Sequence, residues 1–119
     1  MTKEELGKLG EELACEMLSK KGYFIKKRNY RFDRAEVDII AEKDKMIVFV
    51  EVKARESDYL SDAALLVPMK KQKQIIKAAD AYLKENDLDN EGRFDIVIAI
   101  INSKYKKLDH LEDAFYPTL

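Results

Sequence analysis

The segment Met46–Arg55, MIVFVEVKAR, decides the fold because it predicts a strand that is buried on both faces of a sheet. Seven of its ten residues are apolar, and four of them are β-branched. Side chains alternate along a strand, so Glu51 and Lys53 share one face with Ile47 and Phe49. Charges at the end of such a strand must be solvated, paired or bound to a ligand. The segment therefore predicts a central strand with a candidate site at its C-terminal end.

A second acidic strand is predicted just upstream, at residues 36–41 (EVDIIA), and the turn EKDK joins the two strands into a hairpin. If this turn is centred between Asp44 and Lys45, Asp38 lies opposite Glu51 and on the same face. Lys53 then lies beside both carboxylates. Two carboxylates offer the hard oxygen ligands that a divalent cation prefers, so the hairpin predicts a metal site with an ammonium group next to it.

Length and composition predict one domain, spanning residues 1–119, that is large enough to form a core without disulfides. The single cysteine, Cys15, excludes an intramolecular disulfide and is typical of a reducing compartment. The sequence has no apolar run of 18 residues, and its first residues do not resemble a signal peptide. We therefore expect a cytoplasmic protein that does not interact with membranes.

Charge is unevenly distributed along a chain whose formal net charge is only −1. Residues 20–34 contain seven lysines and arginines but one aspartate, and residues 70–77 contain four lysines and no acid. The second group lies at the predicted start of a helix, where the helix dipole disfavours cations. Basic patches beside an acidic pocket suit a polyanionic ligand, although a solvated surface of mixed charge explains them equally well.

The remaining patterns complete an α/β sandwich in which helices flank a central mixed sheet, in the order α-β-β-β-α-β-β. A capping box at Thr2 and Glu5 opens the first helix, and Gly22 ends it. Residues 56–66 are the least informative segment and predict a loop or a short helix. The other predicted elements are strands at residues 23–30, 93–101 and 108–116 and a helix at residues 68–85.

Residues along nearly the whole chain resemble a known family. Asp38, followed by Glu51-Val52-Lys53, is similar to the signature of the restriction-endonuclease-like PD-(D/E)XK nuclease superfamily. Further matches in order are Gly7, Gly10-Glu11, Ala14, Gly22-Tyr23, Asn29-Tyr30-Arg31, Glu36, Phe49-Val50, Arg55, Lys71, Ala79, Tyr82-Leu83, Arg93-Phe94-Asp95, His110 and Ala114-Phe115. Together they resemble the YraN family, small bacterial proteins similar to archaeal Holliday-junction resolvases. Ala35 departs from the glycine that this family commonly carries before the Glu-x-Asp.

The resemblance implies a Mg²⁺ or Mn²⁺ ion held by Asp38, Glu51 and the backbone carbonyl of Val52. It makes Glu11 a candidate further ligand, while Glu36 is a candidate that ranks below it. Lys53 would orient the attacking water or stabilise the charge that develops on the phosphate. The candidates for binding the phosphate backbone of DNA, without reading its sequence, are Arg31, Arg55 and Lys71.

The function that these residues favour is metal-dependent hydrolysis of DNA phosphodiester bonds by an endonuclease, with branched DNA as a candidate substrate. The alternatives are a nucleic-acid-binding module of the same fold that does not cleave, and an adaptor in a DNA-processing complex. DNA selected by structure rather than by sequence is the expected partner. A homodimer is a further candidate, suggested by related resolvases and by the apolar content of residues 59–69.

Two other polar residues are interpreted without a catalytic role. Asp95, which lies close to Arg93 in the sequence, is interpreted as a structural residue. His110 is interpreted as a lone histidine in a polar turn, and the absence of a second histidine or a nearby cysteine argues against a zinc site.

Overall fold

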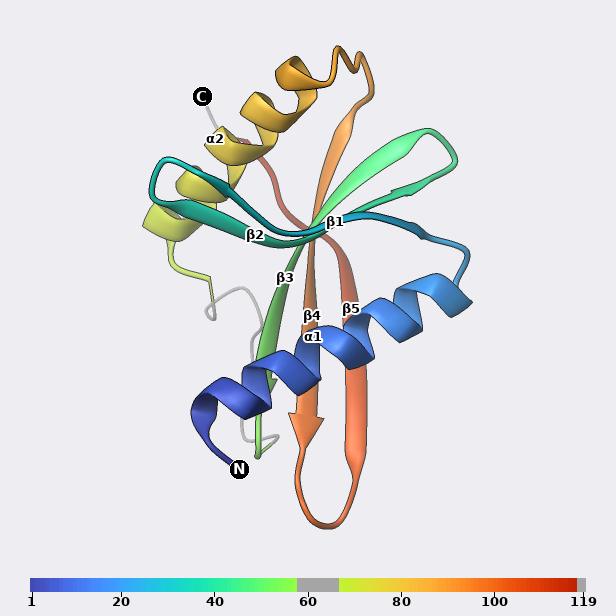
Figure 1. Ribbon diagram of the computed structural model, residues 1–119, viewed down its shortest axis with the longest axis vertical. Helices are drawn as coiled ribbons and strands as arrows, with labels where there is room; N and C mark the ends of the chain where they lie inside the picture. Colours follow the sequence, from blue (N-terminus) through green and yellow to red (C-terminus); the bar gives the residue numbers. More distant parts are fainter. Residues whose placement is uncertain (58–66, 118–119) are drawn as a thin grey trace.

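Helices cover both faces of a mixed five-stranded sheet in the computed structural model, which describes residues 1–57 and 67–117 (Figure 1). The strands lie side by side in their order along the chain, and the predicted α-β-β-β-α-β-β order is confirmed. Only β3 and β4 are parallel, and α2 connects them. The elements are α1 (Lys3–Lys20), β1 (Phe24–Phe32), β2 (Ala35–Lys43), β3 (Met46–Arg55), α2 (Met69–Glu85), β4 (Gly92–Ile101) and β5 (Lys106–Phe115).

The β2–β3 hairpin has the predicted register. Ile39 pairs with Val50 and Ile40 pairs with Phe49, as a turn centred between Asp44 and Lys45 requires. Both turn residues have positive φ, 50° and 67°, which is the backbone conformation that a tight two-residue hairpin needs. This register brings residues 38 and 51 to the same level of the sheet.

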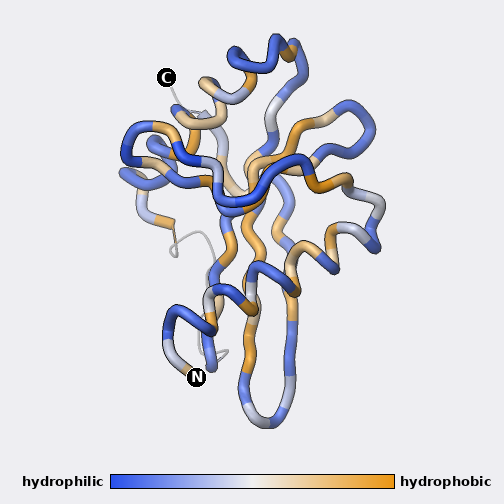
Figure 2. The backbone as a smooth tube through the Cα atoms, viewed as in Figure 1, coloured by the Kyte–Doolittle hydropathy of each residue, from blue (hydrophilic) through white to orange (hydrophobic). Residues whose placement is uncertain are grey.

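Alternation along β3 divides the apolar core into two layers. Ile47 and Phe49 pack on the α2 side, whereas Val48 and Val50 pack on the α1 side. Hydrophobic residues accordingly concentrate in the central strands, while the connecting turns are hydrophilic (Figure 2). β3 is therefore buried on both faces, as its composition predicts, and its charged residues appear only toward its C-terminal end.

The boundaries of two strands differ from those predicted. β1 extends to Phe32 and β5 begins at Lys106, two residues beyond each prediction, because antiparallel pairing with β2 and β4 continues past the apolar residues. Ala35 has no positive φ and is paired within the sheet, so alanine is accommodated there. Residues 58–66 lie outside the described residues, and they include most of the predicted loop and of the segment that suggested a dimer. No described helix is long and apolar enough to cross a membrane.

The face that α1 presents to the sheet is a narrow stripe. Leu6, Gly10, Ala14 and Leu18 are its buried residues, and the other large apolar side chains lie at the border of this stripe. The two small residues let the helix approach the sheet closely. A Cβ atom placed on Gly10 would lie only 2.8 Å from the Cβ of Ala54. Close packing at Gly10 therefore fixes the distance between α1 and β3.

We expect Gly10→Ala to destabilise the protein by about 1–3 kcal/mol, because an added methyl group overpacks a contact that neither backbone can relieve. Gly7→Ala is the matched control, since no atom outside the local helix lies within 4 Å of the position of its Cβ. This substitution should stabilise the protein by about 0.5–1 kcal/mol through helix propensity. Chemical denaturation of both variants measures the difference. Equal effects of the two substitutions would contradict the close packing of α1.

Candidate functional site

Asp38 and Glu51 meet where β2 and β3 carry their charged residues, as the hairpin register predicts. The Asp38 Oδ2 atom accepts a hydrogen bond of 2.8 Å from the backbone N–H of Val52. Glu51 precedes Val52 in β3, and its side chain is only 2% exposed. The backbone of β3 thus holds one carboxylate directly beside the other.

Two lysines approach the Glu51 carboxylate from different elements. The Nζ atom of Lys53 lies 3.5 Å from Glu51 Oε2, and its side chain is 16% exposed. The Nζ atom of Lys71, in the first turn of α2, contacts the same oxygen. Lys53 therefore lies beside the Glu51 carboxylate, whereas Lys71, predicted to bind DNA phosphates, forms an ion pair inside the site.

The two carboxylates ionise very differently. Burial raises the pKa of Asp38 to about 9, and the neighbouring Glu51 adds to this increase, although the Val52 N–H opposes it. Burial alone would raise the pKa of Glu51 too, but its contacts with Asp38, Lys71 and Lys53 outweigh burial and lower that pKa. The opposite directions of the two pKa shifts indicate that the pair shares one proton and that Asp38 binds it more tightly than Glu51 does.

Glu51 keeps capacity for a further ligand. Its two buried oxygens accept no hydrogen bond of ordinary geometry from the described residues, and its neighbours there are the Asp38 carboxyl and the two lysines. Next to it lies a cavity of about 230 Å³ whose wall includes Asp38. The other residues that line this cavity are Arg34, Ala35, Glu36, Lys71, Gln74 and Ile75. The sequence does not indicate that Arg34 and Gln74 belong to this site, because only the packing of α2 against β2 brings them together.

The two additional acids predicted as ligands have other partners. Glu11, in α1, accepts a 3.1 Å hydrogen bond from the Asn29 side chain. The charge of Glu11 also raises the pKa of Asp38, although by less than burial and the neighbouring Glu51 do. Glu11 is therefore close enough to the site to act on it electrostatically. Glu36 lines the cavity and forms a 3.0 Å ion pair with Arg31 across the β1–β2 pairing.

The two arginines predicted to bind DNA are at the surface. Arg31 has a side chain that is 81% exposed despite its ion pair with Glu36. Arg55 is also exposed, and its guanidinium donates a 2.8 Å hydrogen bond to the carbonyl oxygen of the preceding Ala54. Both positively charged groups remain accessible to an anion.

A second polar cluster forms around Asp95, and here the interpretation of His110 is wrong. His110 belongs to β5 rather than to a turn, and its Nε2 atom lies 2.7 Å from Asp95 Oδ2. Its side chain is only 3% exposed. Asp95 also accepts two hydrogen bonds from Arg93, at 2.9 and 2.8 Å, and one from the Asp113 N–H at 3.0 Å. The contacts of Asp95 with Arg93 agree with its interpretation as a structural residue, whereas its histidine partner was not predicted.

This cluster offers potential metal ligands as well, but they are already engaged. One ligand atom each from Asp95, His110 and Glu112 lies within 4.8 Å of the others. The guanidinium of Arg93 is bonded to Asp95 and lies 3.2 Å from the Glu112 carboxylate. A fixed positive charge between the acids balances their charge without an ion, so this arrangement suits a structural role that links β4 to β5.

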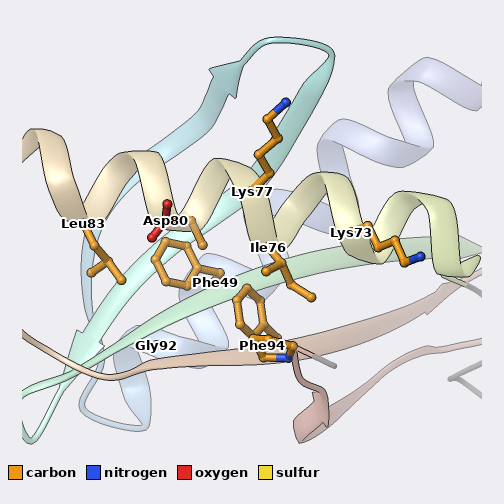
Figure 3. Close-up of a pocket in the computed structure, with 10 residues that line it drawn as sticks. Phe49, Lys73, Ile76, Lys77, Asp80, Leu83, Gly92 and Phe94 are labelled. Carbon is orange, nitrogen blue, oxygen red and sulfur yellow. The ribbon is translucent and has the colours of Figure 1, made fainter. Parts of the chain in front are cut away.

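A cavity larger than the one beside Asp38 is not a site for this chemistry. It measures about 480 Å³ and lies between α2 and the sheet, over the aromatic rings of Phe49 and Phe94 (Figure 3). Asp80 is the one acid among its lining residues, and Lys73 and Lys77 are at its border. Without a second carboxylate, this groove cannot reproduce the ligand set that Asp38 and Glu51 provide.

The fold and the site thus define an α/β protein with the spaced acid and Glu-x-Lys arrangement on neighbouring strands. The chain belongs to the uncharacterised protein family UPF0102, which matches residues 10–100 and which confirms the resemblance to the YraN family. A UPF0102 protein of Flavobacterium psychrophilum is 48% identical over 94% of both chains. UPF0102 proteins of Christiangramia forsetii and Bacteroides thetaiotaomicron are 44% and 41% identical over at least 94% of each chain.

The raised pKa of Asp38 predicts that the metal-free protein becomes less stable as the pH rises. Between pH 4 and 9 the folded protein keeps a proton on Asp38 that the unfolded chain releases, because the pKa moves from 3.8 to about 9. The contribution of this residue to the free energy of unfolding therefore falls as the pH rises through that range. Asp38→Asn should remove this contribution.

Urea denaturation at several pH values between 5 and 8, in the presence of a chelator, measures this dependence. Asp109→Asn is the matched control, since Asp109 lies in β5 with a half-exposed side chain. The control should keep the slope of the wild-type protein. A slope that Asp38→Asn leaves unchanged would show that Asp38 does not hold the proton.

Proposed function

We propose that this protein is a metal-dependent endonuclease that hydrolyses DNA phosphodiester bonds at Asp38, Glu51 and Lys53. The observation that carries the proposal is the buried Glu51 carboxylate, whose oxygens are not saturated and which lies beside a second carboxylate and a cavity. A buried acid without a full set of hydrogen bonds lowers the stability of the protein, so the presence of Glu51 at this position favours a role in binding a ligand.

The residues fit a Mg²⁺ or Mn²⁺ ion. Asp38 and Glu51 offer hard oxygen donors, which these cations prefer, and the Val52 carbonyl and Glu11 remain candidates to complete the ligand set. When bound, the metal would act as a Lewis acid toward the phosphate and lower the pKa of water. Asp38 has to release its proton before it can serve as an anionic ligand.

Lys53 would supply a fixed positive charge next to the reacting phosphate. Burial lowers the pKa of Lys53, but Glu51 opposes this effect and holds the ammonium group in place. A cation fixed in a largely buried site stabilises charge that develops on a phosphate more strongly than a solvated cation does. This role requires little movement of Lys53, because its ammonium group already lies beside the Glu51 carboxylate.

DNA is the proposed substrate because accessible cations surround the acidic site. Arg31 and Arg55 are exposed, and Lys71 and Arg34 line the cavity next to Asp38. Contacts of this kind bind the phosphate backbone without reading its sequence, so affinity should fall steeply with salt. A two-fold homodimer acting on branched DNA is part of this proposal, since such DNA presents paired strands to a symmetric protein.

A nucleic-acid-binding module that does not cleave is the second candidate. The ion pair of Lys71 with Glu51 favours it, because an internal cation already balances the carboxylate without a metal. The two functions are separated by incubating branched, flapped, single-stranded and duplex DNA with the protein in Mg²⁺, in Mn²⁺ and in a chelator. Cleavage that requires metal supports the endonuclease, whereas binding with no cleavage under any condition supports the module.

We expect Lys53→Met to reduce single-turnover cleavage by roughly two orders of magnitude or more, as the loss of a transition-state charge does. Methionine retains the apolar stem but removes one of the two cations beside the buried Glu51, so the stability should fall by about 3 kcal/mol or less, since Lys71 remains. Lys107→Met, in exposed β5, removes the same charge away from the site and should cleave at nearly the wild-type rate. A Lys53→Met variant that folds and cleaves normally would reduce Lys53 to a structural role.

A further inference from the structure

Lys71 holds an unusual position for a lysine in the first turn of a helix. α2 begins at Met69, which two lysines follow; it has no acidic residue in its first turn, and Pro68 provides no side-chain cap. The positive end of the helix dipole and the lysines therefore repel one another locally. Lys71 is set apart from its exposed neighbours Lys70 and Lys73 because its ammonium group contacts the buried Glu51 carboxylate.

The two lysines on Glu51 differ in their freedom to leave it. Lys53 extends from β3 itself and is 16% exposed, so the surrounding chain retains its ammonium group. Lys71 is 42% exposed, extends from a helix and lines the cavity that opens beside Asp38. A long, flexible side chain at this position can rotate toward solvent at little cost.

We propose that Lys71 is an internal cation that neutralises Glu51 in the metal-free protein and is displaced when a divalent cation binds there. This inference rests on the proposed metal site. Lys71 contacts Glu51 Oε2 and lies in the same cavity wall as Asp38, so it occupies the side of the carboxylate that a metal shared with Asp38 has to approach. A divalent cation added beside Lys53 and Lys71 would place a third positively charged group on one carboxylate, so Lys71, the more exposed of the two lysines, leaves.

The arrangement explains how a buried, unsaturated carboxylate is tolerated before a metal arrives. An isolated ionised carboxylate is costly in the protein interior, and Lys71 supplies the second positive charge that compensates for it. The same contact competes with the metal. Lys71 therefore stabilises the metal-free protein and lowers its affinity for the metal.

The test compares Lys71→Met with Lys70→Met, which removes an exposed lysine from the same helical turn. Calorimetric titration with MnCl₂, without DNA, should show roughly tenfold tighter binding to Lys71→Met than to the wild-type protein. The affinity of Lys70→Met for Mn²⁺ should lie within about twofold of the wild-type affinity, because Lys70 is exposed and salt screens its charge. Lys71→Arg should keep the weaker, wild-type-like affinity, since it retains the competing cation.

Thermal unfolding provides a second readout that does not depend on cleavage. Metal-free Lys71→Met should unfold at a lower temperature than the wild type, and Mn²⁺ should raise its unfolding temperature by more than it raises that of the wild type. If Lys71→Met does not fold, Lys71→Gln replaces it, since glutamine can donate a neutral hydrogen bond to Glu51. The double variant Asp38→Ala, Glu51→Ala shows whether the measured ion binds at this site.

The outcomes separate this inference from the proposed function. Equal Mn²⁺ affinities for the wild type and Lys71→Met would overturn the displacement of Lys71 but would leave the metal site intact. Binding that persists unchanged in the double variant, or no binding to any variant, would overturn both the metal site and the displacement. Tighter binding to Lys71→Met alone, lost in the double variant, supports both.

Discussion

The burial of the Glu51 carboxylate is the constraint on which the site depends. Its side chain is 2% exposed, in a strand whose preceding residues are core on both faces. A charge in such surroundings requires compensation, and three different elements provide it. Asp38 from β2 keeps a proton, Lys53 from β3 and Lys71 from α2 supply positive charge, and the position of α2 over the sheet becomes part of the electrostatic balance.

The apolar core determines whether that compensation is possible. α2 carries Lys71 at its first turn and packs Ile75, Ala79 and Tyr82 into the core over Phe49. Because α2 is rigid, its apolar packing against β3 determines where the ammonium group of Lys71 lies. On the opposite face, the close contact of Gly10 with Ala54 holds α1, and with it the charge of Glu11, near the same end of the sheet. Packing and electrostatics are thus coupled through both helices.

The part of the site that the sequence could predict is the part that depends on local geometry. A turn centred between Asp44 and Lys45 determines the register of β2 on β3, and this alone brings Asp38 to Glu51. Lys71 could not be paired with Glu51, because that contact depends on how far α2 crosses the sheet. His110 could not be paired with Asp95 either, because the β4–β5 register shifts between Phe94 and Ile96. Such contacts follow from tertiary packing, which periodicity does not determine.

Asp95 and Glu51 are both buried acids, but their different hydrogen bonding suits a structural role for Asp95 and a chemical role for Glu51. Burial would raise the pKa of Asp95, but the hydrogen bonds from His110, Arg93 and the Asp113 N–H more than compensate and lower it. Those donors saturate its oxygens, so Asp95 has little capacity for another ligand. Glu51 is equally buried, yet only two lysines balance its charge and neither oxygen has a hydrogen bond of good geometry from the described residues. A fully bonded carboxylate stabilises a fold, whereas an incompletely bonded one beside a cavity can exchange partners. Exchange of partners is the property that a metal site requires.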